Sequence, residues 1–264
     1  MDLQLQGKSV LVTGASKGIG LACALAFAAE GAARLHIASR TEADLKAAAS
    51  VIRAKHKTEV VIHALDLGHS ADQLTLAQRC ADIDILVNNA GAIPSGGILD
   101  VNEERWRMAW DLKVFGFINL TREVYRRMKE RRSGVIINII GMAGERHRPD
   151  YIAGTAGNAA LMAFTRGVGG ESTDYGVRAV GVNPGRIETE RQITHMKERA
   201  ERELGDTSRW TEIQTKVSAT LPFKRAGQPS EVGDLVAFLA SPRAAYISGT
   251  IVSIDGGASL RTRA

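Results

Sequence analysis

Short apolar runs alternate along the chain with longer segments whose apolar residues recur at helical spacing. The runs are almost entirely apolar and rich in β-branched residues, as in parallel strands that helices cover on both faces. We predict strands at Ser9–Thr13, Leu35–Ser39, Val60–Asp66, Ile83–Asn88, Val135–Ile140, Ala179–Asn183 and Thr250–Ile254. Helices of ten or more residues are predicted to begin near Gly18, Thr41, Ser70, Asn102, Tyr151 and Pro229.

Regular alternation of this kind predicts an α/β fold with a doubly wound parallel sheet and helices on both faces. The chain has 264 residues, and no linker or repeat interrupts the alternation. We therefore expect a single domain over residues 1–264. Ligands of such sheets bind beyond the carboxyl ends of the strands, so the strand ends are where chemistry is expected.

Composition narrows the class of protein. Hydrophobic residues make up 44% and charged residues 24%, which is ordinary for a globular protein in water. No apolar stretch approaches the roughly 20 residues of a membrane span, and the N-terminus has no export-signal pattern. Cys23 and Cys80 are isolated in helical patterns, which fits a reducing compartment better than a disulfide framework. We expect a cytoplasmic protein without a membrane partner.

The net charge of +5 raises the question of nucleic-acid binding. The densest basic run, residues 126–132, ends a long helical pattern, where cations complement the helix dipole. Aromatic residues do not alternate with these cations as they do on strand-binding surfaces. A solvated helix end is the favoured interpretation, and no nucleic-acid partner is expected.

The end of the first predicted strand reads VTGASKGIG. Gly14, Gly18 and Gly20 would allow the turn to approach a pyrophosphate, and the following helix N-terminus offers N–H groups and a positive dipole. The spacing GxxxGxG differs from the general GxGxxG fingerprint, and a simple tight turn is the alternative. Its position between a strand and a helix favours dinucleotide binding.

Five motifs occur in one order: TGASKGIG (13–20), NNAG (88–91), a Tyr-led helix at 151, NPGRIET (183–189) and SGTIVSIDGG (248–257). Together they resemble the short-chain dehydrogenase/reductase family over about residues 5 to 258. The resemblance implies a seven-stranded Rossmann sheet, NAD(P) binding and a homotetramer. It implies that Asp66, at the end of the third strand, meets the adenine and that Thr189 holds the nicotinamide amide. It places the cofactor against Thr13, Gly14, Ser16, Lys17, Gly18, Ile19, Gly20, Ser39, Arg40, Asp66, Leu67, Asn89, Ala90, Gly91, Tyr151, Pro184, Gly185, Ile187 and Thr189.

The choice of dinucleotide depends on the end of the second strand. NAD-selective sites place an acidic residue there to bind the ribose hydroxyls. This chain has Ser39 and Arg40 instead, and Lys17 lies inside the glycine turn. Because a guanidinium binds phosphate well, we expect NADP(H), with NAD(H) as the second candidate and solvated cations as the alternative.

The family's active site is a tetrad of Asn, Ser, Tyr and Lys, and three of its positions differ here. Tyr151 matches the tyrosine, but Thr155 stands at the lysine position and Gly141 at the serine position. Lys113 stands at the asparagine position, and no lysine lies between Lys129 and Lys197 to restore the pattern.

Lowering a tyrosine pKa from about 10 to about 7 requires roughly 4 kcal/mol, which Thr155 cannot supply. Lys113 is the candidate substitute, so we assign Tyr151, Lys113 and Thr155 to the catalytic site. Two alternatives stay open: Lys113 turned to solvent in a non-catalytic site, or another catalytic arrangement. Asn158, one helical turn beyond Thr155, is unusual for the family.

Two further segments belong to the expected substrate side. Residues 146–148, Arg-His-Arg, lie in a shortened loop before Tyr151, where His147 could donate a proton and the arginines could bind an anion. Two apolar stripes in residues 187–222 predict a pair of helices that the family uses as a substrate lid; simple surface helices are the alternative. They comprise Ile193, Met196, Ala200 and Leu204, and Trp210, Ile213, Val217 and Leu221.

The sequence as a whole favours an NADP(H)-dependent enzyme that interconverts a carbonyl and an alcohol on a bulky small-molecule substrate. The alternative is an NADP(H)-binding protein of the same fold with little or no turnover, serving as a sensor or assembly partner. The feature that distinguishes the enzyme from the binding protein is whether a positively charged side chain lies close to Tyr151.

Overall fold

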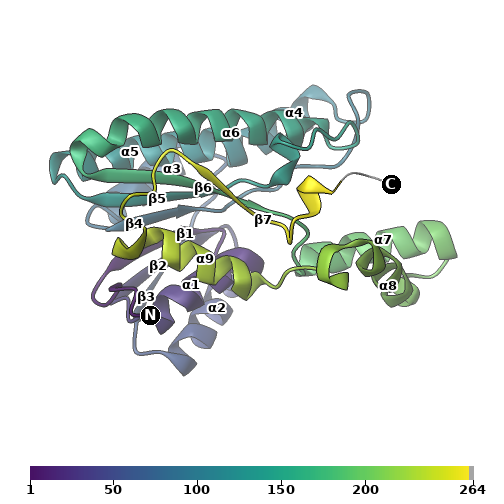
Figure 1. Ribbon diagram of the computed structural model, residues 1–264, viewed down its shortest axis with the longest axis horizontal. Helices are drawn as coiled ribbons and strands as arrows, with labels where there is room; N and C mark the ends of the chain where they lie inside the picture. Colours follow the sequence, from purple (N-terminus) through teal and green to yellow (C-terminus); the bar gives the residue numbers. More distant parts are fainter. Residues whose placement is uncertain (262–264) are drawn as a thin grey trace.

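A computed structural model gives the structure of the protein and describes residues 1–261. Within this range all strand pairs are parallel and form one seven-stranded sheet in the order β3-β2-β1-β4-β5-β6-β7 (Figure 1). The strands are β1 Ser9–Thr13, β2 Arg34–Ser39, β3 Glu59–Ala64, β4 Ile85–Asn88, β5 Gly134–Ile139, β6 Val177–Pro184 and β7 Ile251–Ile254. The strand order reverses at β1 and β4, which creates a crevice at their carboxyl ends.

Helices cover both faces of the sheet (Figure 1). One face carries α1 (Gly18–Ala29), α2 (Glu42–Lys55) and α9 (Pro229–Ala240), which share one apolar core with the sheet. The other face carries α3 (Ser70–Arg79), α4 (Glu103–Trp110), α5 (Gly116–Glu130) and α6 (Ile152–Glu171). The doubly wound Rossmann architecture predicted from the sequence is confirmed.

Most strand predictions differ from the structure at their ends, and the difference at β3 affects the expected site. We predicted that Asp66 ends this strand, but β3 ends at Ala64. The neighbouring strand β2 ends at Ser39, which pairs with Ala64. The residues after Ala64 therefore have no strand beside them with which to pair. Asp66 instead lies in a turn, where its carboxylate accepts the Gly68 N–H at 3.0 Å.

The helical segment that begins after Asn102 is also more complex than predicted. A π-helical turn, Asp111–Phe115, separates α4 from α5. Such turns insert one residue into the helix and are frequent at functional sites. Lys113 lies in the middle of this turn.

Helices α7 (Glu190–Leu204) and α8 (Trp210–Thr220) extend beyond the sheet at its carboxyl end (Figure 1). Their predicted apolar stripes pack on each other around Met196, Ala200 and Ile213. Gly205 ends α7 with φ +68°, a left-handed conformation that glycine adopts readily. Among the helices formed by residues 1–261, none has the length and apolar character needed to span a membrane.

Candidate active site

The glycine turn lies at the carboxyl end of β1 and leads into α1. Gly14 and Gly18 have φ of +63° and +58°, and a Cβ on Gly20 would lie 2.2 Å from the Gly14 carbonyl oxygen. The first turn of α1 has no acidic residue, and Lys17 gives it no side-chain cap within the described chain. The first N–H groups of α1 are therefore available to an anion, as a pyrophosphate site requires.

Thr13 and Asn89 hold the turn against the end of β4. The Thr13 hydroxyl accepts the N–H groups of Asn89 and Ala90 at 2.9 and 3.0 Å. The Asn89 amide donates to the carbonyls of Thr13 and Gly14 at 2.9 and 3.1 Å. Thr13 is only 1% exposed, so its side chain supports the turn through these buried hydrogen bonds and is not on the surface of the site. Ser16 and Ile19 lie half-buried on the turn itself.

The predicted selectivity residues lie at the carboxyl end of β2. Arg40 is exposed and its guanidinium is 3.9 Å from the Asp66 carboxylate. The Ser39 hydroxyl is buried and has no hydrogen-bond partner among residues 1–261. Lys17 is also exposed and pairs with Glu190 at 3.4 Å. Leu67, by contrast, places its side chain in the core.

The segment after β6 faces the glycine turn. A Cβ on Gly18 would lie 3.5 Å from the Thr189 methyl group, so the start of α7 and the start of α1 are close neighbours. Thr189 caps α7 by accepting the Gln192 N–H at 3.4 Å. A Cβ on Gly185 would meet Asp255 at 2.6 Å, and Ile187 is buried. Pro184 ends β6 immediately before these residues.

Tyr151 precedes α6 as its N-cap residue. Its ring lies over Gly154, where a Cβ would be 1.9 Å from the ring carbon Cε1. The ring also packs with an apolar cluster that contains Ile93, Ala109 and Ala153. Burial raises the pKa of the Tyr151 hydroxyl, and the positive charges of two arginines, Arg191 and then Arg148, oppose this rise.

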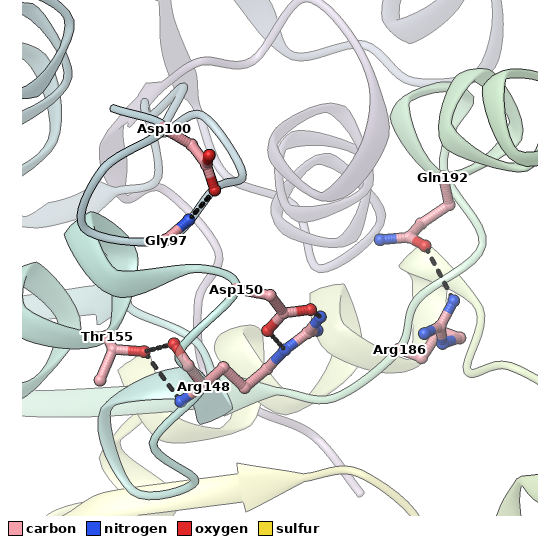
Figure 2. Close-up of polar contacts among 7 residues, drawn as sticks. All are labelled: Gly97, Asp100, Arg148, Asp150, Thr155, Arg186 and Gln192. Atoms are coloured by element: carbon pink, nitrogen blue, oxygen red, sulfur yellow. Dashed lines mark hydrogen bonds and ion pairs between the residues drawn. The ribbon is translucent and has the colours of Figure 1, made fainter. Parts of the chain in front are cut away.

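Thr155 fastens the shortened loop to α6. Its hydroxyl lies 3.2 Å from both the N–H and the carbonyl of Arg148, so it accepts from one and donates to the other (Figure 2). Arg148 also binds Asp150 through two hydrogen bonds of 3.0 and 2.6 Å (Figure 2). The lysine position is thus occupied by a loop anchor.

The two loop arginines are both engaged with protein groups, which weakens the expectation that they bind an anion. Arg146 donates to the carbonyl of Ala258 at 2.8 Å, and Arg148 binds Asp150. His147 is exposed on the same loop. A third arginine, Arg186, lies after β6 and donates to the side chain of Gln192 at 3.4 Å (Figure 2).

Lys113 points into the protein, so the alternative that it turns to solvent is wrong. It is 9% exposed, and its ammonium donates to the carbonyls of Ile139 and Ile140 at 2.9 and 3.2 Å. Its Nζ also lies 5.0 Å from the centre of the Phe117 ring. A Cβ on Gly91 would lie 2.4 Å from Lys113 Cδ, so Gly91 makes room for the lysine stem.

The environment of Lys113 disfavours its charge. Burial lowers its pKa to about 7, and the positive charge of Arg191 contributes in the same direction. Lys113 therefore changes its charge near neutral pH, which an exposed lysine does not.

The serine position is structurally closed to a side chain. Gly141 has φ +120°, a conformation that side chains rarely tolerate. Its carbonyl accepts the Asn158 amide at 3.3 Å, and its N–H donates to Asn183 at 3.2 Å. Asn158 is buried, and its Oδ1 atom has no partner in the described part of the chain.

Sequence reasoning missed Arg191. This residue extends from α7 and donates to the carbonyl of Ile93 at 2.6 Å. Its charge acts on both Tyr151 and Lys113. The position of Arg191 two residues after Thr189 is the one feature of the sequence that places it near the expected site. Its contact with the Ile93 carbonyl depends on the path of α7, which the sequence does not show.

A buried amide network behind the site was also missed. Asn88 donates to Thr121 and Asn138, each at 2.9 Å, and Asn138 donates to Thr165 at 2.9 Å. These bonds link β4 and β5 with helices α5 and α6. The network is not fully satisfied, because Asn88 Oδ1 has no partner among residues 1–261, but its bonds still hold these elements in one arrangement.

Comparison with known proteins agrees with this geometry. The sequence model of the short chain dehydrogenase family matches residues 8–200. An uncharacterized oxidoreductase of Thermotoga maritima is 31% identical over 97% of this chain and 99% of its own length. Galactitol 2-dehydrogenase (L-tagatose-forming) of Cereibacter sphaeroides is 34% identical over 96% of each protein.

Solved structures give the same result. L-sorbose reductase from Gluconobacter frateurii, in complex with NADPH and L-sorbose, superposes with a TM-score of 0.92 at 31% identity over all of both chains. YwfH, an NADPH-dependent reductase involved in bacilysin biosynthesis, superposes with a TM-score of 0.87 at 27% identity over 96% of this chain and 98% of its own.

Proposed function

This chain belongs to the short chain dehydrogenase family, and from that premise we propose that it is an NADP(H)-dependent carbonyl reductase in which Tyr151 donates the proton. The observation that carries the proposal is the half-buried Tyr151 side chain, which follows the loop beyond β5 and has two guanidinium charges acting on its hydroxyl. Oxidation of the corresponding alcohol is the reverse of the same reaction.

The residues around the glycine turn fit a dinucleotide. The uncapped N-terminus of α1 and the three turn glycines offer a pyrophosphate cradle. Arg40 and Lys17 are exposed cations on the side where the family resemblance places the adenosine ribose, which supports NADP(H). Two structural neighbours, L-sorbose reductase and YwfH, are described as NADPH-bound and NADPH-dependent, which agrees with this choice. NAD(H) is the second candidate.

The state of Tyr151 favours reduction. Bound NADPH would supply the hydride, and the substrate oxygen then needs a proton. A tyrosine whose pKa is raised is protonated at neutral pH, so Tyr151 already carries the proton that it must donate. Oxidation has the opposite requirement, because that direction needs a tyrosinate, and burial disfavours the tyrosinate here.

Lys113 is proposed to replace the missing tetrad lysine as a nearby cation, but not by lowering the tyrosine pKa, because that pKa is raised and the charges acting on it are those of Arg191 and Arg148. Its buried ammonium lies at the carboxyl end of β5, against Gly91 of the NNAG motif, and its pKa of about 7 keeps part of the population charged at neutral pH. We assign it electrostatic support of the oxygen that becomes negative during reduction. Arg191 assists from the lid side, and Thr155 positions the loop that precedes Tyr151.

The substrate class follows from the lid and the relatives. Helices α7 and α8 would close over a bulky substrate, and Arg191 would couple lid closure to Tyr151. Two relatives act on a polyol or a ketose by name, galactitol 2-dehydrogenase and L-sorbose reductase. Ketoses therefore belong in the substrate panel beside bulky apolar ketones.

The proposal is tested with purified protein by following NADPH absorbance against this panel. Turnover that Tyr151→Phe abolishes supports it. Binding of NADPH without turnover of any substrate would favour the alternative, a binding protein of the same fold.

A further inference from the structure

A second cluster of chemically reactive side chains lies far from the tyrosine in the sequence and outside the site just described. It consists of His36 on β2, His63 on β3 and Cys80 at the end of α3. All three are buried, with 4%, 4% and 1% of their surface exposed. Each offers one ligand atom, and these three atoms lie within 4.8 Å of one another.

The fold brings these residues together from three elements. His63 pairs in register with Ala38, so it occupies the same face of the sheet as His36, two residues earlier on the neighbouring strand. Helix α3 covers this face, and its C-cap residue Cys80 completes the cluster. No two of the three residues are close enough in sequence to meet without the fold.

Two of the three separations are close to those of ligands that share one ion. His36 Nδ1 is 3.0 Å from His63 Nε2, and Cys80 Sγ is 3.6 Å from the same His63 atom. Metal–ligand distances of zinc put two nitrogens about 3.3 Å apart and a nitrogen and a sulfur about 3.6 Å apart in a tetrahedral site. The imidazoles need to separate by only about 0.3 Å to reach this geometry.

The three side chains differ in how readily they can bind a metal ion. Burial lowers the pKa of His63 to about 4 and also lowers that of His36, so both rings are neutral and keep a lone pair at neutral pH. Burial raises the pKa of the Cys80 thiol to about 12, so the thiol must release a proton as a metal binds. His36 Nε2, the ring nitrogen that does not face His63, is buried without a hydrogen-bond partner among residues 1–261, so hydrogen bonding satisfies only one side of this ring.

The surrounding charges are mixed. Asp82 raises the pKa of both His36 and Cys80, which places a negative charge close to the cluster. Arg79 and Arg127 act in the opposite direction on Cys80, and Arg34 does so on His36. Arg34 is itself paired with Glu59 at 2.9 Å and with Asp82 at 3.5 Å, so much of its charge is compensated.

From this arrangement we infer that His36, His63 and Cys80 form a binding site for one zinc-type divalent cation. Two imidazoles and a thiolate are the donor set that such ions prefer, and a water molecule would complete four ligands. A bound ion would tie β3 and β2, two neighbouring strands at one edge of the sheet, to α3.

The test uses Co²⁺ as a spectroscopic probe for Zn²⁺ on the full chain after treatment with a chelator. The chain has two cysteines, Cys80 and Cys23, and Cys23 is buried in the other core with its pKa also raised to about 12. Cys23→Ala is therefore the matched control for Cys80→Ala. We expect one equivalent of Co²⁺ to give a thiolate-to-cobalt charge-transfer band in the wild type and in Cys23→Ala.

Cys80→Ala should lose this band and bind the ion more than about 100-fold more weakly, because loss of a direct ligand exceeds the usual effect of second-sphere changes. His36→Gln should weaken binding in the same way and keeps the protein testable if Cys80→Ala does not fold. Zn²⁺ should displace Co²⁺ and raise the melting temperature of the wild type. Absence of a one-to-one complex in the folded wild type, or a band that survives in Cys80→Ala, would overturn the assignment.

Discussion

The ring of Tyr151 rests directly on the backbone of Gly154, so closely that a Cβ at this position would lie 1.9 Å from the ring. Both residues belong to the first turn of α6 and its cap, where i and i+3 positions face each other. The absence of a side chain at residue 154 therefore fixes where the tyrosine hydroxyl can lie.

Gly154→Ala should displace the Tyr151 ring and lower turnover by about 100-fold, since errors near 1 Å in the position of a reacting group have effects of this size. The measurement is kcat with NADPH and an accepted carbonyl substrate. Gly167→Ala is the matched control, because Gly167 lies in the same helix and a Cβ there would meet no atom within 4 Å. That variant should keep its turnover and gain about 0.5–1 kcal/mol of stability. Equal turnover in both variants would contradict the assigned role of the ring.

Thr155→Val should destabilise the protein by about 1 kcal/mol, because the Arg148 N–H loses its partner while the Arg148 carbonyl still accepts the Tyr151 N–H. Urea unfolding measures the change. Thr155→Ser retains the hydroxyl and should stay close to the wild type. If Val and Ser variants are equally stable, Thr155 does not anchor the loop.

The glycine turn and the sheet could be predicted from the sequence because they depend on local patterns: apolar runs, three glycines and a following helix. The role of Thr155 could not, because it depends on the path of the loop that brings Arg148 over the helix. The inward direction of Lys113 depends on the π-helical turn, and the contribution of Arg191 depends on how α7 returns to Ile93. These are long-range relationships that residue spacing does not reveal.

Arg40→Asp should weaken NADPH binding and narrow or reverse the preference over NADH, since a carboxylate repels the 2′-phosphate and accepts ribose hydroxyls. Fluorescence titration of both cofactors measures the two dissociation constants. Lys46→Asp is the control, because Lys46 is an exposed cation on the neighbouring helix that already pairs with Glu42. Equal affinities of the wild type for NADPH and NADH would overturn the cofactor assignment.

The protein is expected to assemble as a homotetramer, as the resemblance implies. A groove of about 470 Å³ on α4 and the π-helical turn is lined by the aromatic residues Trp106, Trp110 and Phe115 and by the charged residues Glu103, Arg107 and Asp111, and Phe115 is 47% exposed. Contact with a second copy would bury this surface. Light scattering at micromolar concentration should give four times the chain mass, and Phe115→Glu should reduce it. A monomeric wild type would refute the expectation.

The most direct test of the proposed site is the pH dependence of kcat/KM for carbonyl reduction in the wild type and in Lys113→Met. The pKa of Lys113 is about 7, so its charge is present below that pH and is lost as the pH rises through it. If the cation supports the reaction, the wild-type rate falls above about pH 7. Lys113→Met should then be slower by on the order of 100-fold and lack this limb, leaving only a decline at the raised pKa of Tyr151. Identical profiles and rates in the two proteins, with Tyr151→Phe inactive, would show that Lys113 does not replace the missing lysine.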